Sequence, residues 1–95
     1  MFKILIVDDD RDFSKALETF LSRNGYEVCY AYDAEKAYDA IYKNVFDLII
    51  SDIMMPGTDG FQFATQVRSV NPTIPLLFIS ALDDIQSKHL SLIHI

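Results

Sequence analysis

Short apolar runs alternate along the chain with segments whose apolar residues recur at helical spacing. The apolar runs are short and rich in β-branched residues, and they predict four strands at residues 2–7, 26–32, 46–51 and 76–79. Between them, apolar positions three or four residues apart predict helices at residues 11–24, 33–44 and 60–70. The almost continuous apolar character of the first run is typical of a parallel strand covered on both faces.

Polar residues and glycine mark where the predicted helices begin and end. Asp10 or Asp12 can cap the first helix. Gly25 can adopt the left-handed backbone conformation that commonly ends a helix. Asp33 and Asp59 are placed to cap the second and third helices. These signals agree with the periodicity, so we expect the order βαβαβαβ.

A sheet of parallel strands joined by right-handed helical crossovers, with helices on both faces, follows from this alternation. In such α/β folds, sites form beyond the carboxyl ends of the strands. Three of the four predicted strands end there in polar groups, namely Asp8 with Asp9, Asp52, and Ser80. We therefore expect residues far apart in sequence to meet at one edge of the sheet.

Composition narrows the class of protein. The chain has 95 residues, enough for one domain, and 51% of them are hydrophobic, which favours a globular fold over disorder. A net charge of −6 argues against nucleic acid or an anionic membrane as a direct partner of this segment. The single cysteine, Cys29, excludes an internal disulfide and a zinc cluster. Without a signal peptide or a membrane-spanning apolar run, the expected location is the cytoplasm.

The acidic cluster indicates a particular chemistry. Carboxylates held close together repel one another unless a cation lies between them. Mg²⁺ suits such a site because it binds through one or two carboxylates, water and phosphate oxygens. A carboxylate beside Mg²⁺ can attack phosphorus and form an aspartyl phosphate. A hydroxyl such as that of Ser80 could then donate a hydrogen bond to the phosphoryl group.

Three segments carry a resemblance to a known family. They are Lys3–Asp10 (KILIVDDD), Asp47–Gly60 (DLIISDIMMPGTDG) and Pro75–Ala81 (PLLFISA). Together, in this order and spacing, they resemble the receiver domain of two-component response regulators, over residues 1 to about 88. The resemblance implies a flavodoxin-like, doubly wound parallel sheet with strand order 2-1-3-4-5, an order for which a chemotaxis receiver is a standard example.

The resemblance also implies roles for individual residues. Asp52 resembles the phosphoacceptor and Ser80 the switch hydroxyl. Asp9 resembles the direct Mg²⁺ ligand, and Asp8 resembles a residue that acts mainly through water. Asp52 and the backbone carbonyl of Met54 resemble the other protein ligands of the ion. The backbone amides of Met54 and Ala81 resemble the groups that contact the phosphoryl group. The implied donor is a sensor histidine kinase or a phosphotransfer protein. The implied module is not an enzyme beyond slow self-phosphorylation and autodephosphorylation.

The chain departs from the family pattern after the fourth predicted strand. Family members continue through a fourth helix, a fifth strand that carries a lysine, and a fifth helix. Here Asp83 and Asp84 predict the start of a helix, and Lys88 would lie in it rather than at a strand end. We therefore expect residues 1–89 to be a partial receiver that has lost its output domain. The fourth strand should be an unpaired edge, and the isolated chain should fold poorly or aggregate.

The last six residues, Leu90 to Ile95, suggest a separate origin. They can be encoded by CTG TCT CTT ATA CAC ATC, the transposon end used in a common sequencing-library adapter. We hypothesise that residues 90–95 are translated adapter sequence.

Two other classes of function stay open at this stage. A non-signalling fragment or receiver-like binding module would show no phosphorylation. A Mg²⁺-dependent phosphohydrolase of the haloacid-dehalogenase type would need a nucleophile two residues before a second aspartate, a spacing that Asp8 and Asp10 allow. The residues from Met55 to Gly60 fit the receiver better.

Overall fold

The computed structural model describes residues 1–52, 54–55, 58–81 and 88–91, and the side chains of residues 1–52 and 62–79. A central sheet has the strand order β2-β1-β3-β6-β7. Its strands are β1 (Lys3–Val7), β2 (Glu27–Ala31), β3 (Leu48–Asp52), β6 (Leu76–Ala81) and β7 (Lys88–Ser91). The helices are α1 (Arg11–Arg23), α2 (Ala34–Lys43) and α3 (Gly60–Val70). A short antiparallel pair, β4 (Met54–Met55) and β5 (Thr58–Asp59), lies between β3 and α3.

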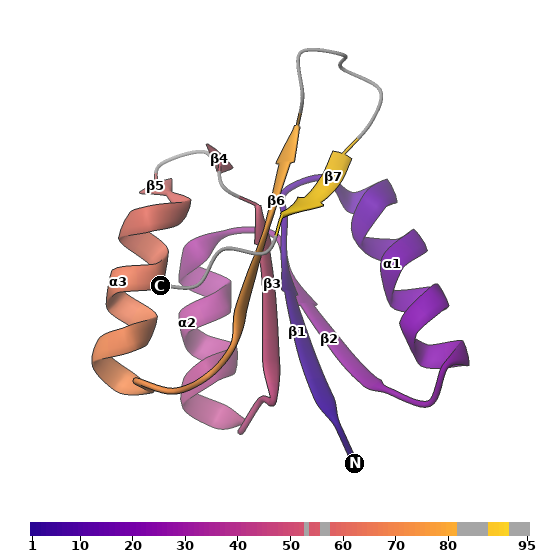
Figure 1. The fold of residues 1–95 in the computed structure, drawn as a ribbon, viewed down its shortest axis with the longest axis horizontal. Helices are drawn as coiled ribbons and strands as arrows, with labels where there is room; N and C mark the ends of the chain where they lie inside the picture. The colour runs from indigo at the N-terminus through magenta and orange to yellow at the C-terminus, as the bar shows by residue number, and fades with distance from the viewer. Residues whose placement is uncertain (53, 56–57, 82–87, 92–95) are drawn as a thin grey trace.

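The four strands expected from the sequence form one parallel sheet. β1 pairs with β2 on one side and with β3 on the other, and β3 pairs with β6, all in parallel. Helix α1 lies on one face of the sheet and α2 and α3 lie on the other (Figure 1). This arrangement confirms the predicted doubly wound α/β fold and the family order 2-1-3-4 for the first four strands.

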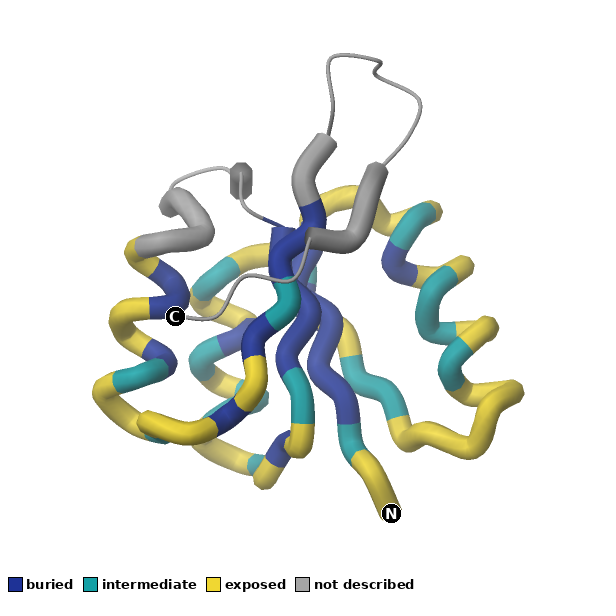
Figure 2. Tube along the Cα trace, in the orientation of Figure 1, coloured by how far each residue is buried: buried dark blue, intermediate teal, exposed yellow. Residues whose placement is uncertain are grey.

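Side-chain alternation along each strand divides the core into two layers. In β1, Ile4 and Ile6 pack toward α1, and Leu5 and Val7 pack toward α2 and α3. Strands β1 and β3 are therefore buried on both faces, as Figure 2 shows by their dark blue centres. Burial on both faces explains why their sequences are continuous apolar runs rather than alternating ones.

The caps of α1 and α2 fall where the sequence predicted. The Asp10 carboxylate accepts a hydrogen bond from the Phe13 amide at 3.0 Å, and Asp33 accepts one from the Lys36 amide at 2.8 Å. Gly25 follows α1 with φ +92°, a left-handed conformation that L side chains rarely adopt. Helices α1 and α2 thus each begin with a backbone amide that is hydrogen-bonded to the capping aspartate. Helix α1 ends in a turn that leads into β2.

One apolar residue of α1 lies outside the core. Phe13, Leu17, Phe20 and Leu21 are the apolar residues whose helical spacing predicts this helix. Phe13, Leu17 and Leu21 pack on the sheet, but the Phe20 side chain is 62% exposed. The fully buried Ser14 shows that the inner face is rotated toward residues 14, 17 and 21, which places Phe20 on its flank.

Strand β7 corrects two predictions. Lys88 lies in a strand rather than in a helix, and β6 is paired on both sides because β7 lies antiparallel to it. The unpaired edge of β6, one ground for expecting the isolated chain to aggregate, is therefore absent from the described residues. The physical reason is the length of the connection. Only residues 82–87 separate the two strands, and a parallel return needs a crossover of about a dozen residues or more. The helix expected from Asp83 and Asp84 lies outside the described residues.

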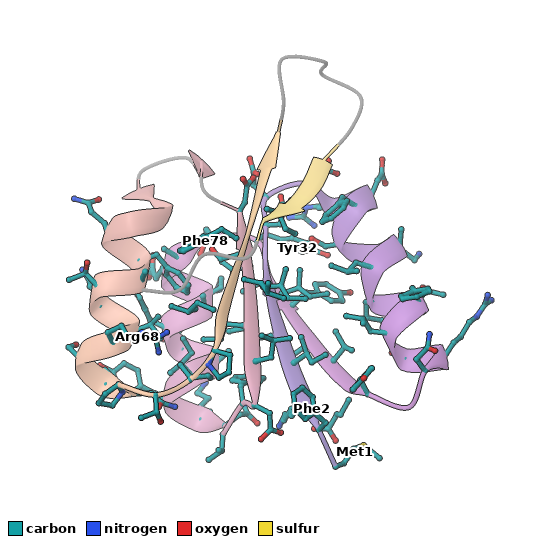
Figure 3. All side chains as sticks on the ribbon, viewed as in Figure 1. Met1, Phe2, Tyr32, Arg68 and Phe78 are labelled. Carbon is teal, nitrogen blue, oxygen red and sulfur yellow. The ribbon has the colours of Figure 1, made fainter. Side chains whose placement is uncertain are left out.

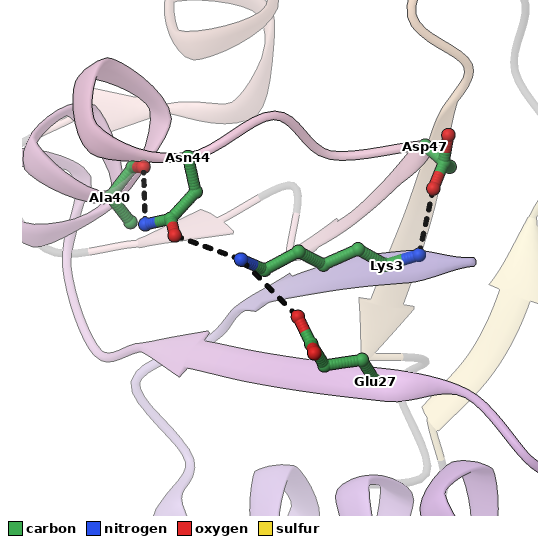
Figure 4. Close-up of polar contacts among 5 residues, drawn as sticks. All are labelled: Lys3, Glu27, Ala40, Asn44 and Asp47. Atoms are coloured by element: carbon green, nitrogen blue, oxygen red, sulfur yellow. Dashed lines mark hydrogen bonds and ion pairs between the residues drawn. The ribbon is translucent and has the colours of Figure 1, made fainter. Parts of the chain in front are cut away.

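The amino-terminal end of the sheet is joined by a polar network centred on Lys3 (Figure 4). The Lys3 ammonium donates to Asn44 Oδ1 at 2.8 Å and pairs with Glu27 at 3.2 Å, and its backbone amide donates to Asp47 at 2.8 Å. Asn44 in turn donates to the Ala40 carbonyl at 3.1 Å near the end of α2. These contacts fix β1, β2, α2 and the start of β3 at the end of the sheet opposite to Asp8 and Asp52.

Candidate metal and phosphoryl site

Three of the predicted site residues meet at the carboxyl edge of the parallel sheet. Asp8 directly follows β1, Asp9 comes next, and Asp52 is the last residue of β3. Carboxylate oxygens of these three residues all lie within 4.8 Å of one another. The convergence follows from topology, because β1 and β3 are parallel neighbours whose ends coincide.

Two of the three carboxylates lie in the protein interior and one faces solvent. Asp8 is 0% exposed and Asp52 is 6% exposed, whereas Asp9 is exposed. A buried carboxylate requires compensating partners, and the Asp10 amide is one for Asp8, whose backbone makes further contacts. Its Oδ1 accepts a hydrogen bond from the Asp10 amide at 2.9 Å, and its backbone amide donates to the Ala31 carbonyl at 3.1 Å. The Ser14 hydroxyl contacts the Asp8 carbonyl at 3.5 Å.

The three carboxylates fit a magnesium ion in ligand type and spacing. Oxygen ligands about 2.1 Å from Mg²⁺ stand roughly 3–4 Å apart, and the carboxylate oxygens here lie within 4.8 Å of one another. All three donors are hard oxygen ligands, with no sulfur or imidazole among them. The open side of the cluster at Asp9 leaves room for the water that Mg²⁺ retains. The residues present therefore fit the ion that the sequence predicted.

The remaining predicted positions are described by their backbone alone. Met54 lies in β4, directly beyond the end of β3, and pairs with Asp59. Ser80 and Ala81 are the last two residues of β6, and Asp52 is in register with Ile79, the residue before Ser80. Ser80 is thus at the same edge as Asp52. The Ser80 hydroxyl lies outside the described residues.

Asp10 has a different role from its neighbours. Its carboxylate caps α1, and the carboxylate cluster contains Asp9 instead. The phosphohydrolase reading needs Asp10 as a second catalytic carboxylate beside Asp8. Because the Asp10 carboxylate binds the Phe13 amide, the structure does not favour that alternative.

Sequence reasoning missed a pair of residues that borders the cluster. The guanidinium carbon of Arg11 lies 4.1 Å from the centroid of the Tyr32 ring, and the Tyr30 ring lies 5.2 Å from Tyr32. Desolvation raises the pKa of the Tyr32 hydroxyl, as do its hydrogen bond to Tyr30 and the charge interaction with Tyr30, while Arg11 acts in the opposite direction. Tyr32 follows β2 directly, so the rule that sites form at strand carboxyl ends could have found it.

The fold and the carboxylate cluster define an α/β domain with an acidic site at the carboxyl edge of its parallel sheet. The comparisons identify the family. Residues 4–93 match the family model for the response regulator receiver domain. The chain belongs to this family, whose members are signalling modules of two-component systems. Among the described helices, none is long and apolar enough to cross a membrane.

Curated relatives share much of this chain but are longer. The response regulator MprA of Mycobacterium sp. (strain KMS) is 40% identical over 86 residues, which cover 90% of this chain and 37% of MprA. The uncharacterized transcriptional regulatory protein YbdJ of Bacillus subtilis (strain 168) is 38% identical over 87 residues, covering 92% of this chain and 38% of YbdJ. The chain therefore spans somewhat more than a third of the length of these relatives.

Solved structures show the same fold. The response regulator TrrA of Thermotoga maritima, in complex with Mg²⁺-BeF, superposes with a TM-score of 0.81 at 30% identity, covering 90% of this chain and 75% of TrrA. The chemotaxis response regulator CheY4 of Vibrio cholerae superposes with a TM-score of 0.81 at 36% identity, covering 87% of this chain and 71% of CheY4. Both confirm the predicted receiver fold.

Proposed function

We propose that this chain receives a phosphoryl group on the Asp52 carboxylate in a phosphorelay. The observation that carries the proposal is the convergence of Asp8, Asp9 and Asp52 within 4.8 Å at the end of two neighbouring parallel strands. The family and the Mg²⁺-BeF complex of TrrA, a relative by fold and sequence, support it.

The protein's own residues supply position and charge for the transfer. Asp52 is held at the end of β3, where an oxygen of its carboxylate attacks phosphorus. The bond from phosphorus to the donor breaks, and its electron pair leaves with the donor group, an imidazole when the donor is a kinase phosphohistidine. Asp8 and Asp9, with Asp52 and the Met54 carbonyl, would hold Mg²⁺. The bound ion would offset negative charge on the carboxylates and the phosphoryl oxygens.

The groups at the end of β6 and in β4 complete the proposed site. The Ser80 hydroxyl would donate to the phosphoryl group, and the Met54 and Ala81 amides would contact its oxygens. These roles rest on the family resemblance and on the backbone positions of β4 and β6. Self-phosphorylation by small donors and loss of the phosphoryl group to water would both be slow.

The partners and context are proposed on the same basis. The donor would be a sensor histidine kinase or a phosphotransfer protein, and the compartment would be the cytoplasm. An output domain would carry the signal further, as the greater length of the curated relatives suggests. We further propose that residues 1–89 are a partial receiver and that residues 90–95 derive from adapter sequence. The codons of the parent gene test this last point, because different codons there would exclude an adapter origin.

The experiment is phosphorylation of the chain by acetyl phosphate in the presence of Mg²⁺, followed by intact mass. The wild-type chain should gain one phosphoryl group, and Asp52→Asn should gain none because an amide is a poor nucleophile. Asp39→Asn is the matched control, since Asp39 is an exposed aspartate on α2. Equal labelling of wild type and Asp52→Asn would overturn the proposal. An unlabelled wild-type chain would favour the non-signalling module.

A further inference from the structure

Arg11 and Tyr32 contact each other, and both are close in sequence to a hydrogen bond that joins the ends of β1 and β2. The Asp8 amide donates to the Ala31 carbonyl at 3.1 Å, which joins the end of β1 to the end of β2. Tyr32 follows Ala31 directly, and Arg11 begins α1 two residues after Asp9. In Figure 3, Tyr32 lies well away from Met1 and Phe2, which mark the opposite end of β1. The pair therefore belongs to the carboxyl edge of the sheet, where the chain segments that carry it adjoin the residues of the carboxylate cluster.

The stacking holds the Arg11 charge beside the cluster without pairing it to a carboxylate. The guanidinium carbon lies 4.1 Å from the Tyr32 ring centroid, within the range of a cation–π contact. Arg11 is exposed, and among the described residues it forms no salt bridge. An exposed contact of this kind is weak, so the guanidinium can leave the ring when a stronger anionic partner arrives.

The electrostatics of the site make such a cation useful. A phosphoryl donor is an anion and must approach Asp8, Asp9 and Asp52, which repel it. At physiological salt, charges act over a screening length of about 8 Å, so a cation bordering the cluster is felt by the incoming group. A guanidinium also presents paired N–H donors that match phosphate oxygens.

We propose that Arg11, held by Tyr32, is a positioning residue that draws the phosphoryl group of the donor toward Asp52. The inference rests on the proposed phosphorylation of Asp52 and adds to it a specific contact for the anionic donor. Arg11 raises the rate of productive encounter. Arg11 also weakens Mg²⁺ binding slightly, because its charge repels the ion. Arg11 thus raises the labelling rate and lowers the Mg²⁺ affinity.

The test compares Arg11→Gln with Lys15→Gln in the 95-residue chain. Lys15 is an exposed lysine on α1, so its substitution removes the same charge four residues further along. With acetyl phosphate as donor, Arg11→Gln should lower the second-order rate constant of Asp52 labelling by roughly 3–10-fold, less than the steering by a whole charged cleft because a single charge is removed. The same variant should bind Mg²⁺ more tightly than wild type, and Lys15→Gln should leave both quantities within about twofold.

Two further comparisons separate charge and stacking from a merely structural role. Arg11→Lys should restore part of the rate, and Tyr32→Phe should match wild type because the ring remains. Tyr32→Leu should lose part of the rate. At about 1 M salt, where the screening length falls to about 3 Å, the difference between wild type and Arg11→Gln should shrink.

The outcomes distinguish this inference from the proposed function. If wild type is labelled and Arg11→Gln is labelled at the same rate with the same Mg²⁺ affinity, the inference is wrong and the proposed function stands. If Arg11→Gln loses both labelling and Mg²⁺ binding, Arg11 has a structural role and the inference is wrong. If wild type is not labelled at all, the proposed function fails and the inference fails with it.

Discussion

Asp8 and Asp52 belong to different strands, yet their carboxylate oxygens lie within 4.8 Å of each other in a largely buried setting. Two buried carboxylates this close repel each other, so the arrangement carries a cost in the absence of a cation. The parallel register of β1 and β3 imposes the proximity, because Val7 and Ser51 are partners in the ladder. The residue after each partner is an aspartate at the same edge.

Removing the exposed carboxylate should weaken metal binding. Asp9→Ala leaves the buried pair but takes away the ligand that faces solvent. We expect Mg²⁺ affinity to fall by at least roughly tenfold, since even changes outside the first ligand shell cost about 10–100-fold. Without metal, the melting temperature should rise slightly because repulsion is relieved. Calorimetric titration with Mg²⁺ measures the affinity, and Asp12→Ala, an exposed aspartate in the first turn of α1, is the control.

Equal Mg²⁺ affinity in wild type and Asp9→Ala would show that the ion, if it binds, is held elsewhere.

The polar network at the opposite end of the sheet should contribute to stability and not to phosphorylation. Lys3→Met removes the ammonium that binds Asn44 at 2.8 Å and Glu27 at 3.2 Å. We expect the free energy of unfolding to fall by about 1.5–2 kcal/mol, the lower end of what a hydrogen bond to a charged group contributes. Denaturant unfolding measures the loss, with Lys15→Met as the exposed control. A double-mutant cycle with Asn44→Ala should show positive coupling.

Additivity of Lys3→Met and Asn44→Ala would contradict this account of the network, as would a change in the labelling rate of Lys3→Met.

Tyr38 should make folding sensitive to high pH. Burial raises the pKa of its hydroxyl above the usual value of 10.0, and its ring stacks on Phe63 at 5.5 Å. A folded-state pKa above the unfolded one favours the neutral form, so this contribution is fully present below pH 10 and is lost as pH rises through the folded value. Above pH 10, wild type should therefore lose free energy of unfolding relative to Tyr38→Phe. Between pH 7 and 9, the difference between the two proteins should stay constant.

Urea unfolding of both proteins across this range measures the difference. A constant difference up to the highest accessible pH would show that the Tyr38 hydroxyl titrates alike in folded and unfolded chains.

Most of the fold could be predicted because local signals and long-range packing agree. The apolar runs became β1, β3 and β6, and Asp10 and Asp33 became caps. The departures have physical causes. Strand β7 depends on pairing with β6, which its own sequence does not encode, and Phe20 is exposed because packing of the whole helix decides which flank faces the sheet.

The candidate site could be predicted to the extent that topology determines it. Parallel strands bring Asp8, Asp9 and Asp52 together, so their convergence follows from sequence and fold class alone. The Arg11–Tyr32 contact could not be predicted in the same way. It depends on the directions of two side chains from different elements, which periodicity does not specify.

The most direct test of the central claim is to locate the modified residue. After acetyl phosphate treatment with Mg²⁺, borohydride reduction converts an aspartyl phosphate to homoserine, and peptide mass spectrometry then reads the position. We expect Asp52 to be recovered as homoserine, with no homoserine in Asp52→Asn and much less of it without Mg²⁺. Homoserine at Asp8 or Asp9 instead, with Asp52 unmodified, would contradict it.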